Sequence, residues 1–453
     1  MLLVQPMLQQ QPQRRSSPSQ PSPHPPLPGF PGRFQNLDAA PESGTCAGGI
    51  IEALAVSYVA MTGSYPKSVQ MLLARVTSRF GKRPSRPDKS RHIPTLDGWR
   101  ALAILLVIAH HAGTAFYGEK DYYASSPTRF GIWGVPVFFG LSGLLITKLL
   151  LEEFDRTGAI SLKGFYIRRS FRILPPAFAY IMTVAALGLL VSKTELAASF
   201  FFFRNYLPDS LGGIYTNHLW SLAVEEHFYL IWPGLLVWIG VRRGLAAAIS
   251  IAVALALWQS VDFHFQLMAR ILPSLNSQFR TDLRLNGLFC GCTMAFLLNN
   301  PSSREWLRKR YSVWIWMLVA VAFPICLRYQ PYLTVFWLAI LIPLLMLGTA
   351  LHPAWRVSRV LDLAPMKWVG RISYSLYLWQ QLFLVPSWEP KPLGALQHWP
   401  LSILMVLLCA TTSYYLIEKP LIRVGHKLSA RFIARRKEYS VLGLAASGAT
   451  EAI

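Results

Sequence analysis

The chain has 453 residues, of which 53% are hydrophobic, 13% are aromatic and only 15% are charged. Soluble domains average about 45–50% apolar and about 25% charged residues, so this composition excludes an ordinary soluble protein. The formal net charge of +22 would indicate a nucleic-acid partner in a soluble chain. In a membrane chain, the same Lys and Arg residues instead report which loops face the cytoplasm.

The N-terminal part of the chain differs from the rest. Residues 1–70 begin with a Pro-, Gln- and Ser-rich stretch that cannot bury a core, so we expect a disordered tail. The apolar run Gly48–Thr62 is shorter than the roughly 20 residues that cross a bilayer. The translation start could also be misassigned, which would make this tail dispensable or absent. Residues 71–91 form a basic arm that leads into the first span.

The remaining sequence predicts an all-α polytopic membrane protein with about ten transmembrane helices. The apolar segments lie at residues 98–116, 132–151, 172–192, 219–240, 245–261, 284–299, 312–328, 333–351, 371–386 and 400–418. We place the transmembrane domain at 92–425 and a cytoplasmic tail at 426–453. The apolar stretch 197–207 is interpreted as a re-entrant or outer-surface segment, because counting it as a span would invert every later loop.

Positive charge alternates between the two sets of loops that these spans define. One set, which includes both ends of the domain, holds 27 Lys and Arg residues, and the other holds seven. By the positive-inside rule, both termini are therefore predicted to lie in the cytoplasm. Adding or removing one span would break the alternation, which supports the count of ten.

Polar groups inside the predicted spans indicate where chemistry takes place, because an ionisable side chain in a bilayer is costly. In the first span, Arg100 and His111 share a helical face, about 16 Å apart along the axis. Asp97 lies close to that face, whereas His110 points about 100° away. An interhelical hydrogen bond is the plain alternative for the histidine. The alignment favours His111 as a functional group.

Two further clusters join this list. The fourth span opens with Ser221, Glu225 and Glu226, whose carboxylates could orient a catalytic imidazole or simply form a solvated outer cap. Before the third span, Arg168, Arg169 and Arg172 form one ridge. Guanidinium groups grip phosphate bidentately, so this ridge could bind a nucleotide, coenzyme A or a lipid headgroup, although juxtamembrane arginines often serve topology alone.

Weaker candidates are Arg280 and Asp282, before the sixth span, which could bind substrate or form an interfacial ion pair or cap. Glu418 ends the tenth span and could likewise form an interfacial ion pair or a helix cap. Ser142 lies between glycines that permit close helix approach. The five cysteines show no disulfide or metal pattern, and no metal site is predicted.

Seven motifs occur in order: LDGWRALAILLVIAHH, GVPVFFGLSGLLIT, FYIRRSFRILPP, HLWSLAVEEHFYLIWP, RTDLRLNGLFCG, RISYSLYLWQQ and YLIEKP. This set resembles the integral-membrane acyltransferase family 3, the bacterial O-acyltransferases of polysaccharides and lipids. The resemblance covers about 92–425 and implies transfer of an acyl group, commonly acetyl, from cytoplasmic acyl-CoA to a sugar hydroxyl. The family's Arg-x10-His pattern falls on Arg100 and His111, and its Arg-x-x-Arg pattern on Arg169 and Arg172.

The sequence departs from the family at Pro136, where many members have an acidic residue, and at Gln380, where many have His. Some members carry an additional esterase-like domain after the last span, and we expect a stand-alone form here. The resemblance implies a bacterial inner-membrane, multi-pass protein. It implies no resident cofactor, acyl-CoA as co-substrate, and a carbohydrate or lipid-linked acceptor among membrane lipids, with no nucleic acid.

These observations combine into one mechanistic hypothesis. The arginine ridge holds the coenzyme A phosphates, and His111 deprotonates the acceptor hydroxyl or takes the acyl group transiently. Glu225 or Glu226 sets the charge and tautomer of the imidazole, and Arg100 stabilises developing negative charge. The predicted catalytic residues are His111, Glu225, Glu226 and Arg100, and the predicted binding residues are Arg168, Arg169, Arg172, Asp97, Ser221, Arg280 and Asp282.

Two other functions are compatible with a polytopic chain. A transporter or flippase of lipid-linked sugars would explain the intramembrane charges equally well. It predicts internal repeats with paired broken helices, and the two halves of this sequence show no such symmetry. A non-catalytic scaffold or sensor would need none of the buried charges.

Overall fold

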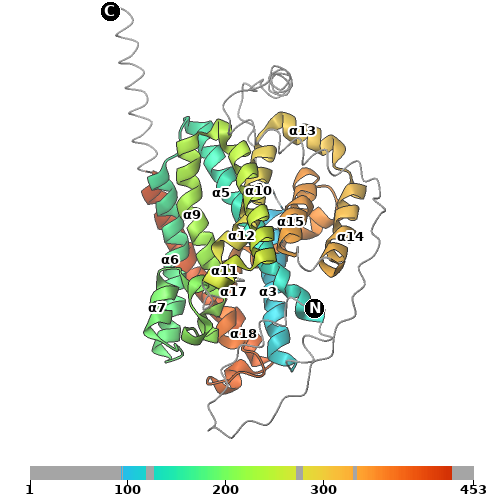
Figure 1. The fold of residues 1–453 in the computed structure, drawn as a ribbon. Coiled ribbons are helices and arrows are strands. Elements are labelled where there is room, and N and C mark those ends of the chain that lie inside the picture. Colours follow the sequence, from blue (N-terminus) through green and yellow to red (C-terminus); the bar gives the residue numbers. More distant parts are fainter. Residues whose placement is uncertain (1–92, 94, 119–126, 272–278, 330–333, 431–453) are drawn as a thin grey trace, which may run out of the picture. The chain divides into compact units, whose positions relative to one another are not determined.

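The computed structural model describes residues 93, 95–118, 127–271, 279–329 and 334–430, which all belong to one compact unit. This part of the chain is helical and contains no β-strand (Figure 1). The predicted tail 1–70, the basic arm 71–91 and most of the predicted C-terminal tail lie outside the described residues.

Every predicted span falls on a helix. These helices are α3 (Leu96–Phe116), α5 (Gly134–Thr157), α6 (Leu162–Ala186), α9 (Leu219–Ile239), α10 (Val241–Phe265), α12 (Thr281–Asn299), α14 (Val313–Tyr329), α15 (Thr334–Leu351), α17 (Ala364–Phe383) and α18 (Leu401–Ser413). The π-helical turn η7 (Tyr414–Glu418) follows α18, and residues 419–430 continue the helix. Shorter elements connect these helices: η2 (Pro127–Trp133), α7 (Lys193–Phe200), η3 (Arg204–Tyr206), η4 (Asp209–Leu211), α8 (Ile214–Asn217), α11 (Leu267–Ile271), α13 (Pro301–Arg310), α16 (Arg356–Leu361) and η6 (Gly394–Gln397).

Several helices have the length and hydropathy of membrane spans. Five satisfy both criteria, at Leu96–Phe116, Phe130–Thr157, Ile214–Ile239, Val241–Phe265 and Leu401–Ala430. A sixth candidate is the pair α13 and α14, which bends by 80° at its break. For the described residues, the prediction of an all-helical chain with several apolar helices able to span a membrane is confirmed. The count of ten and the cytoplasmic termini remain predictions.

Helix α6 begins earlier than the predicted span because of its cap. Ser161 accepts a hydrogen bond from the backbone N–H of Gly164 (3.2 Å), which satisfies one of the free donors at the helix start. The arginine ridge is consequently helical and not part of a loop. Helix α7 has only 8 residues, so it is too short to cross a bilayer, as expected for the stretch 197–207.

The central contact of the bundle is the pairing of α5 with α12. A Cβ atom on Gly143 would lie 1.8 Å from the carbonyl oxygen of Leu288, and one on Gly291 would lie 2.2 Å from that of Gly140. The two backbones therefore meet where only glycine fits, as small residues allow in membrane helices. Helices α6 and α9 lie on one side of this pair and α14 and α15 on the other (Figure 1).

Replacement of Gly143 by Ala tests this close contact. The added methyl group must separate α5 from α12, so we expect a lower midpoint of thermal unfolding in detergent. Gly234 in α9 is the matched control, because a Cβ there meets nothing within 4 Å. Gly234→Ala should leave the midpoint unchanged or raise it, since Ala is the better helix former by about 1 kcal/mol. Equal behaviour of the two variants would contradict the packing described.

Candidate active site

Helix α3 carries Arg100 and His111, which the helical period predicted to lie on one face. Arg100 interacts electrostatically with Arg172, Glu418, Asp97 and Arg169, all from other turns or helices of the bundle. His111, further along the helix, interacts with His218 instead. Side chains in a helix tilt toward its N-terminus, so that of Arg100 leans away from His111. The two residues therefore mark opposite ends of one helical face.

His110 points to a different part of the protein. A Cβ on Gly131 would lie 2.7 Å from the Cβ of His110, so this side of α3 packs on η2. The rings of His110 and His111 are nearly perpendicular, with centroids 5.0 Å apart. The structure thus agrees with the helical geometry that selected His111.

Three arginines and three glutamates from four elements lie within electrostatic range of one another inside the bundle. The arginines are Arg100 of α3 and Arg169 and Arg172 of α6, and the glutamates are Glu225 and Glu226 of α9 and Glu418 of η7. Arg169 interacts with both glutamates of α9, and Arg172 with Glu418. We call these six residues the charged cluster. Its formal charges balance, as burial of charge in an apolar bundle requires.

A tyrosine and a serine complete the cluster on the α9 side. The Tyr229 hydroxyl donates to the Glu225 carboxylate and lies 3.0 Å from the Ser142 hydroxyl of α5. The guanidinium of Arg169 lies over the Tyr229 ring, 5.0 Å from its centroid. Glu225 and Tyr229 share a helical face because they are four residues apart. Three helices therefore meet at this one carboxylate.

The charged cluster borders a space inside the bundle. Arg100, Arg169, Glu225 and Glu226 are enclosed by protein, and so is His111. All five are nevertheless half-buried, so part of each side chain touches no protein. An enclosed side chain with free surface lines an internal space.

The imidazole of His111 is held by its own helix. Its Nδ1 lies 3.1 Å from the carbonyl oxygen of Val107, which can only accept a hydrogen bond. The proton is therefore on Nδ1, and Nε2 keeps a free lone pair. Within the described part of the chain, no hydrogen bond or ion pair joins His111 to Glu225 or Glu226. The backbone of α3, and not a glutamate, sets the tautomer.

Ser221 belongs to a hydrogen-bonded group next to His111. Its hydroxyl lies 2.5 Å from the hydroxyl of Tyr377 in α17, which donates to the carbonyl oxygen of His218 (2.6 Å). The His218 ring packs edge-on against Tyr180, with centroids 5.2 Å apart. Ser221 thus helps to hold the start of α9 to α17 through Tyr377.

Arg168 is separated from its two neighbours on the ridge. Its guanidinium donates to Glu153 of α5 (2.7 Å), and the other oxygen of Glu153 accepts from the backbone N–H of Ser161 (2.7 Å). Glu153 is buried, so this ion pair connects α5 with the start of α6. Of the three predicted phosphate ligands, the structure brings Arg169 and Arg172 into the charged cluster and Arg168 into an ion pair.

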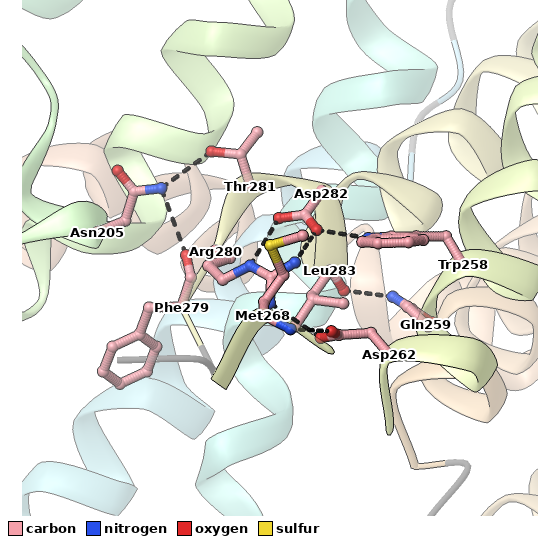
Figure 2. A network of polar contacts seen from close by, with 10 residues as sticks. All are labelled: Asn205, Trp258, Gln259, Asp262, Met268, Phe279, Arg280, Thr281, Asp282 and Leu283. Atoms are coloured by element: carbon pink, nitrogen blue, oxygen red, sulfur yellow. Dashed lines mark hydrogen bonds and ion pairs between the residues drawn. The ribbon is translucent and has the colours of Figure 1, made fainter. Parts of the chain in front are cut away.

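Arg280 and Asp282 form a separate network around the start of α12 (Figure 2). Arg280 donates to Asp262 of α10 (2.9 Å) and to Asp282, and the indole of Trp258 donates to Asp282 (2.6 Å). Although burial opposes its charged form, the hydrogen bonds and charges of Asp282 and Asp262 raise the pKa of Arg280. The network is an ion pair, one of the two structural alternatives that the sequence allowed, and it joins α12 to α10. No side chain caps the start of α12.

Sequence reasoning missed part of the charged cluster. It interpreted Glu418 only as a helix end, and it did not include Tyr229 or Tyr374. Tyr374 donates to the carbonyl oxygen of Ile173 (2.8 Å) and interacts with Glu226 and Glu418. The four-residue spacing of Glu225 and Tyr229 was an available signal. Tyr374 and Glu418 depend on how α17 and η7 pack, which no spacing reveals.

Replacement of Asp262 by Asn tests whether the Arg280 network is structural. Arg280 and Asp262 are 5% and 7% exposed, so the substitution removes the buried one of the two carboxylates that pair with Arg280. We expect a loss of about 1.5–3 kcal/mol of stability, as for one hydrogen bond between charged groups, seen as a lower unfolding midpoint in detergent. An unchanged midpoint together with weaker substrate binding would instead place Arg280 in a binding site.

Comparisons with known proteins agree with the family that the motifs resemble. A family model described as an acyltransferase domain matches residues 93–418. The chain is 30% identical over 378 residues to the peptidoglycan O-acetyltransferase OatA of Listeria monocytogenes, covering 76% of this chain and 58% of that protein. It is 29% identical over 388 residues to the O-acetyltransferase OatA of Staphylococcus aureus, covering 79% of this chain and 61% of that protein.

The chain therefore spans about three fifths of the length of these curated relatives. No solved structure matches it. The ordered motifs, the helical fold and the match over residues 93–418 show that the chain belongs to the acyltransferase family 3.

Proposed function

We propose that this protein is a membrane O-acyltransferase that moves an acyl group, most simply acetyl, from cytoplasmic acyl-CoA to a hydroxyl of a cell-envelope polysaccharide in a bacterial inner membrane. The observation that supports it best is that one bundle holds both the charged cluster and His111, most of whose side chains keep accessible surface. A scaffold gains nothing from three arginines and three glutamates inside an apolar bundle. The alternative function is a transporter or flippase of lipid-linked sugars. The family match does not support it.

The arginines form the donor side of the proposed site. Arg169 and Arg172 hold the anionic groups of acyl-CoA, which guanidinium groups suit by charge and by geometry. Arg100 interacts with both of them, so we assign it to donor binding and not to charge stabilisation at the reacting carbonyl. Arg168 serves this side indirectly, since its ion pair with Glu153 fixes the start of α6.

The histidine forms the acceptor side. Nε2 of His111 takes the proton of the acceptor hydroxyl while the hydroxyl oxygen attacks the thioester carbonyl. The carbon–sulfur bond then breaks, the proton passes to the coenzyme A thiolate, and the O-acyl product leaves. Ser221 and Tyr377 support this half of the site by holding the backbone carbonyl of His218, a residue that interacts electrostatically with His111.

The acceptor class follows from the relatives. The listerial relative is a peptidoglycan O-acetyltransferase, and the staphylococcal one carries the same short name. We therefore propose a cell-wall or related envelope glycan as the acceptor. Asp97 lies at the opposite end of α3 from His111 and interacts with Arg100, which assigns it to the donor side.

Substitution of His111 by Gln tests the proposal. The variant keeps an amide in place of the imidazole but has no base, so acetyl transfer from labelled acetyl-CoA to peptidoglycan fragments should fall by about 10²–10⁴-fold. The assay uses the full chain reconstituted in liposomes.

His110→Gln is the matched control, because His110 lies next in sequence but faces η2. This variant should keep most of the activity. Full activity of His111→Gln would refute the proposed base. Absence of transfer by the wild-type protein with every acyl-CoA tested would refute the function itself.

A further inference from the structure

Helix α13 is a separate helix that begins with its own cap. Its N-cap residue Asn300 accepts hydrogen bonds from the backbone N–H groups of Ser302 (3.0 Å) and Ser303 (3.4 Å). Pro301 takes the first helical position, where an N–H would have no partner within the helix. The last turn is basic, which suits the negative end of the helix dipole. The sequence therefore specifies both ends of α13, independently of α12 and α14.

The direction of α13 differs from that of α14, the helix that follows. The two helices are bent by 80° at their break, so they do not form one straight span. The 10 residues of α13 extend about 15 Å, half the thickness of the hydrocarbon core, and they include four cations. Because α14 is a predicted span, α13 lies close to the plane of the membrane. The loop charges predict that it lies on the cytoplasmic side.

One side of α13 faces the bundle, and most of its remaining surface is exposed. Leu307 packs against the hydrophobic core that contains Tyr311, and the Tyr311 hydroxyl donates to the carbonyl oxygen of Leu344 in α15 (2.9 Å). Figure 1 shows α13 next to the end of α15. Trp306, in contrast, is 50% exposed, and the four cations of the helix are exposed as well. Helix α13 thus contacts the bundle through Leu307 and presents its charges outward.

The exposed surface of α13 combines positive charge with an aromatic ring. The Arg310 guanidinium lies over the Trp306 ring, 4.8 Å from its centroid. Tryptophan is enriched at membrane interfaces, where its indole lies among the lipid headgroups. The carboxylate of Glu305 lies 3.7 Å from Lys309 and 3.9 Å from Arg308, and exposed pairs of this kind contribute little. The helix therefore keeps an excess of positive charge at its surface.

We propose that α13 is an interfacial helix that binds the headgroups of anionic phospholipids at the cytoplasmic face of the membrane. Anionic lipids of that leaflet attract basic segments next to a span, and guanidinium groups bind phosphate well. This inference does not rest on the proposed function, because no residue of α13 belongs to the charged cluster. We call the four basic residues the interfacial cations: Arg304, Arg308, Lys309 and Arg310.

A fluorophore attached to α13 tests the proposal. The full chain carries Trp306→Cys, which keeps the interfacial cations, with the five native cysteines replaced. It is labelled with nitrobenzoxadiazole and reconstituted in phosphatidylcholine liposomes. A small fraction of either phosphatidylglycerol or phosphatidylcholine carries a quenching spin label near the headgroup. We expect the phosphatidylglycerol form to quench about twofold more strongly, because the interfacial cations enrich anionic lipid around α13. Added salt should reduce the difference.

Two sets of arginine variants show which charges cause the difference. Replacement of Arg304, Arg308 and Arg310 by Gln should make the two lipids quench equally. Arg242→Gln combined with Arg243→Gln is the matched control, because these arginines are exposed at the start of α10 on the same predicted side. This control should keep the difference. All the replaced side chains are exposed, so the unfolding midpoints in uncharged detergent should stay alike.

Three results would overturn the proposal. One is equal quenching by the two lipids, or quenching by neither, in the chain with all interfacial cations. Another is a difference that persists after the arginines of α13 are replaced, since other charges would then attract the lipid. The third is loss of the difference when inorganic phosphate or acetyl-CoA is added at constant ionic strength, which would assign the cations to a soluble phosphate ligand. The assay needs no acyl transfer, so failure of the proposed function would leave its result valid.

Discussion

The structure depends on the compensation of charge inside an apolar bundle. An isolated guanidinium or carboxylate at the centre of a membrane protein is costly, so each must be paired or reach water. Here three arginines and three glutamates from four parts of the chain meet at one place. Apart from Glu418, which is 0% exposed, their side chains keep some free surface, so most of this compensation takes place beside space that protein does not fill. In a cluster that is balanced in charge but accessible, an arginine can interact with an anionic ligand in place of a glutamate.

The fold brings these charges together through a few local features. Glycines let α5 and α12 approach closely, which sets Ser142 of α5 opposite Tyr229 of α9. The cap at Ser161 starts α6 early, so its arginines project from a helix and not from a loop. The Arg280 network fastens the start of α12 to α10. Each feature lies outside the charged cluster, yet each limits where the cluster's side chains can be.

The sequence predicted the parts of the site that depend on one helix. The 3.6-residue period selected His111 over His110, and hydropathy located every helix that carries the candidate residues. Contacts between helices were not predictable. The spacing put Arg168 on the same ridge as Arg169, but packing against α5 gives Arg168 a separate partner. The direction of the Glu418 side chain was also not predictable, because the π turn interrupts the 3.6-residue period from which helical faces are assigned.

The accessibility of Ser142 to water tests the central claim most directly. Ser142→Cys is made with the five native cysteines replaced and is treated with a small, charged thiol reagent in intact membranes. We predict that this cysteine reacts, and that acetyl-CoA slows the reaction, because Ser142 lies at the charged cluster. Leu230→Cys, on the outward face of α9 and 67% exposed, should face lipid and stay unlabelled. A Ser142→Cys protein that reacts only after denaturation would contradict the internal space on which the account depends.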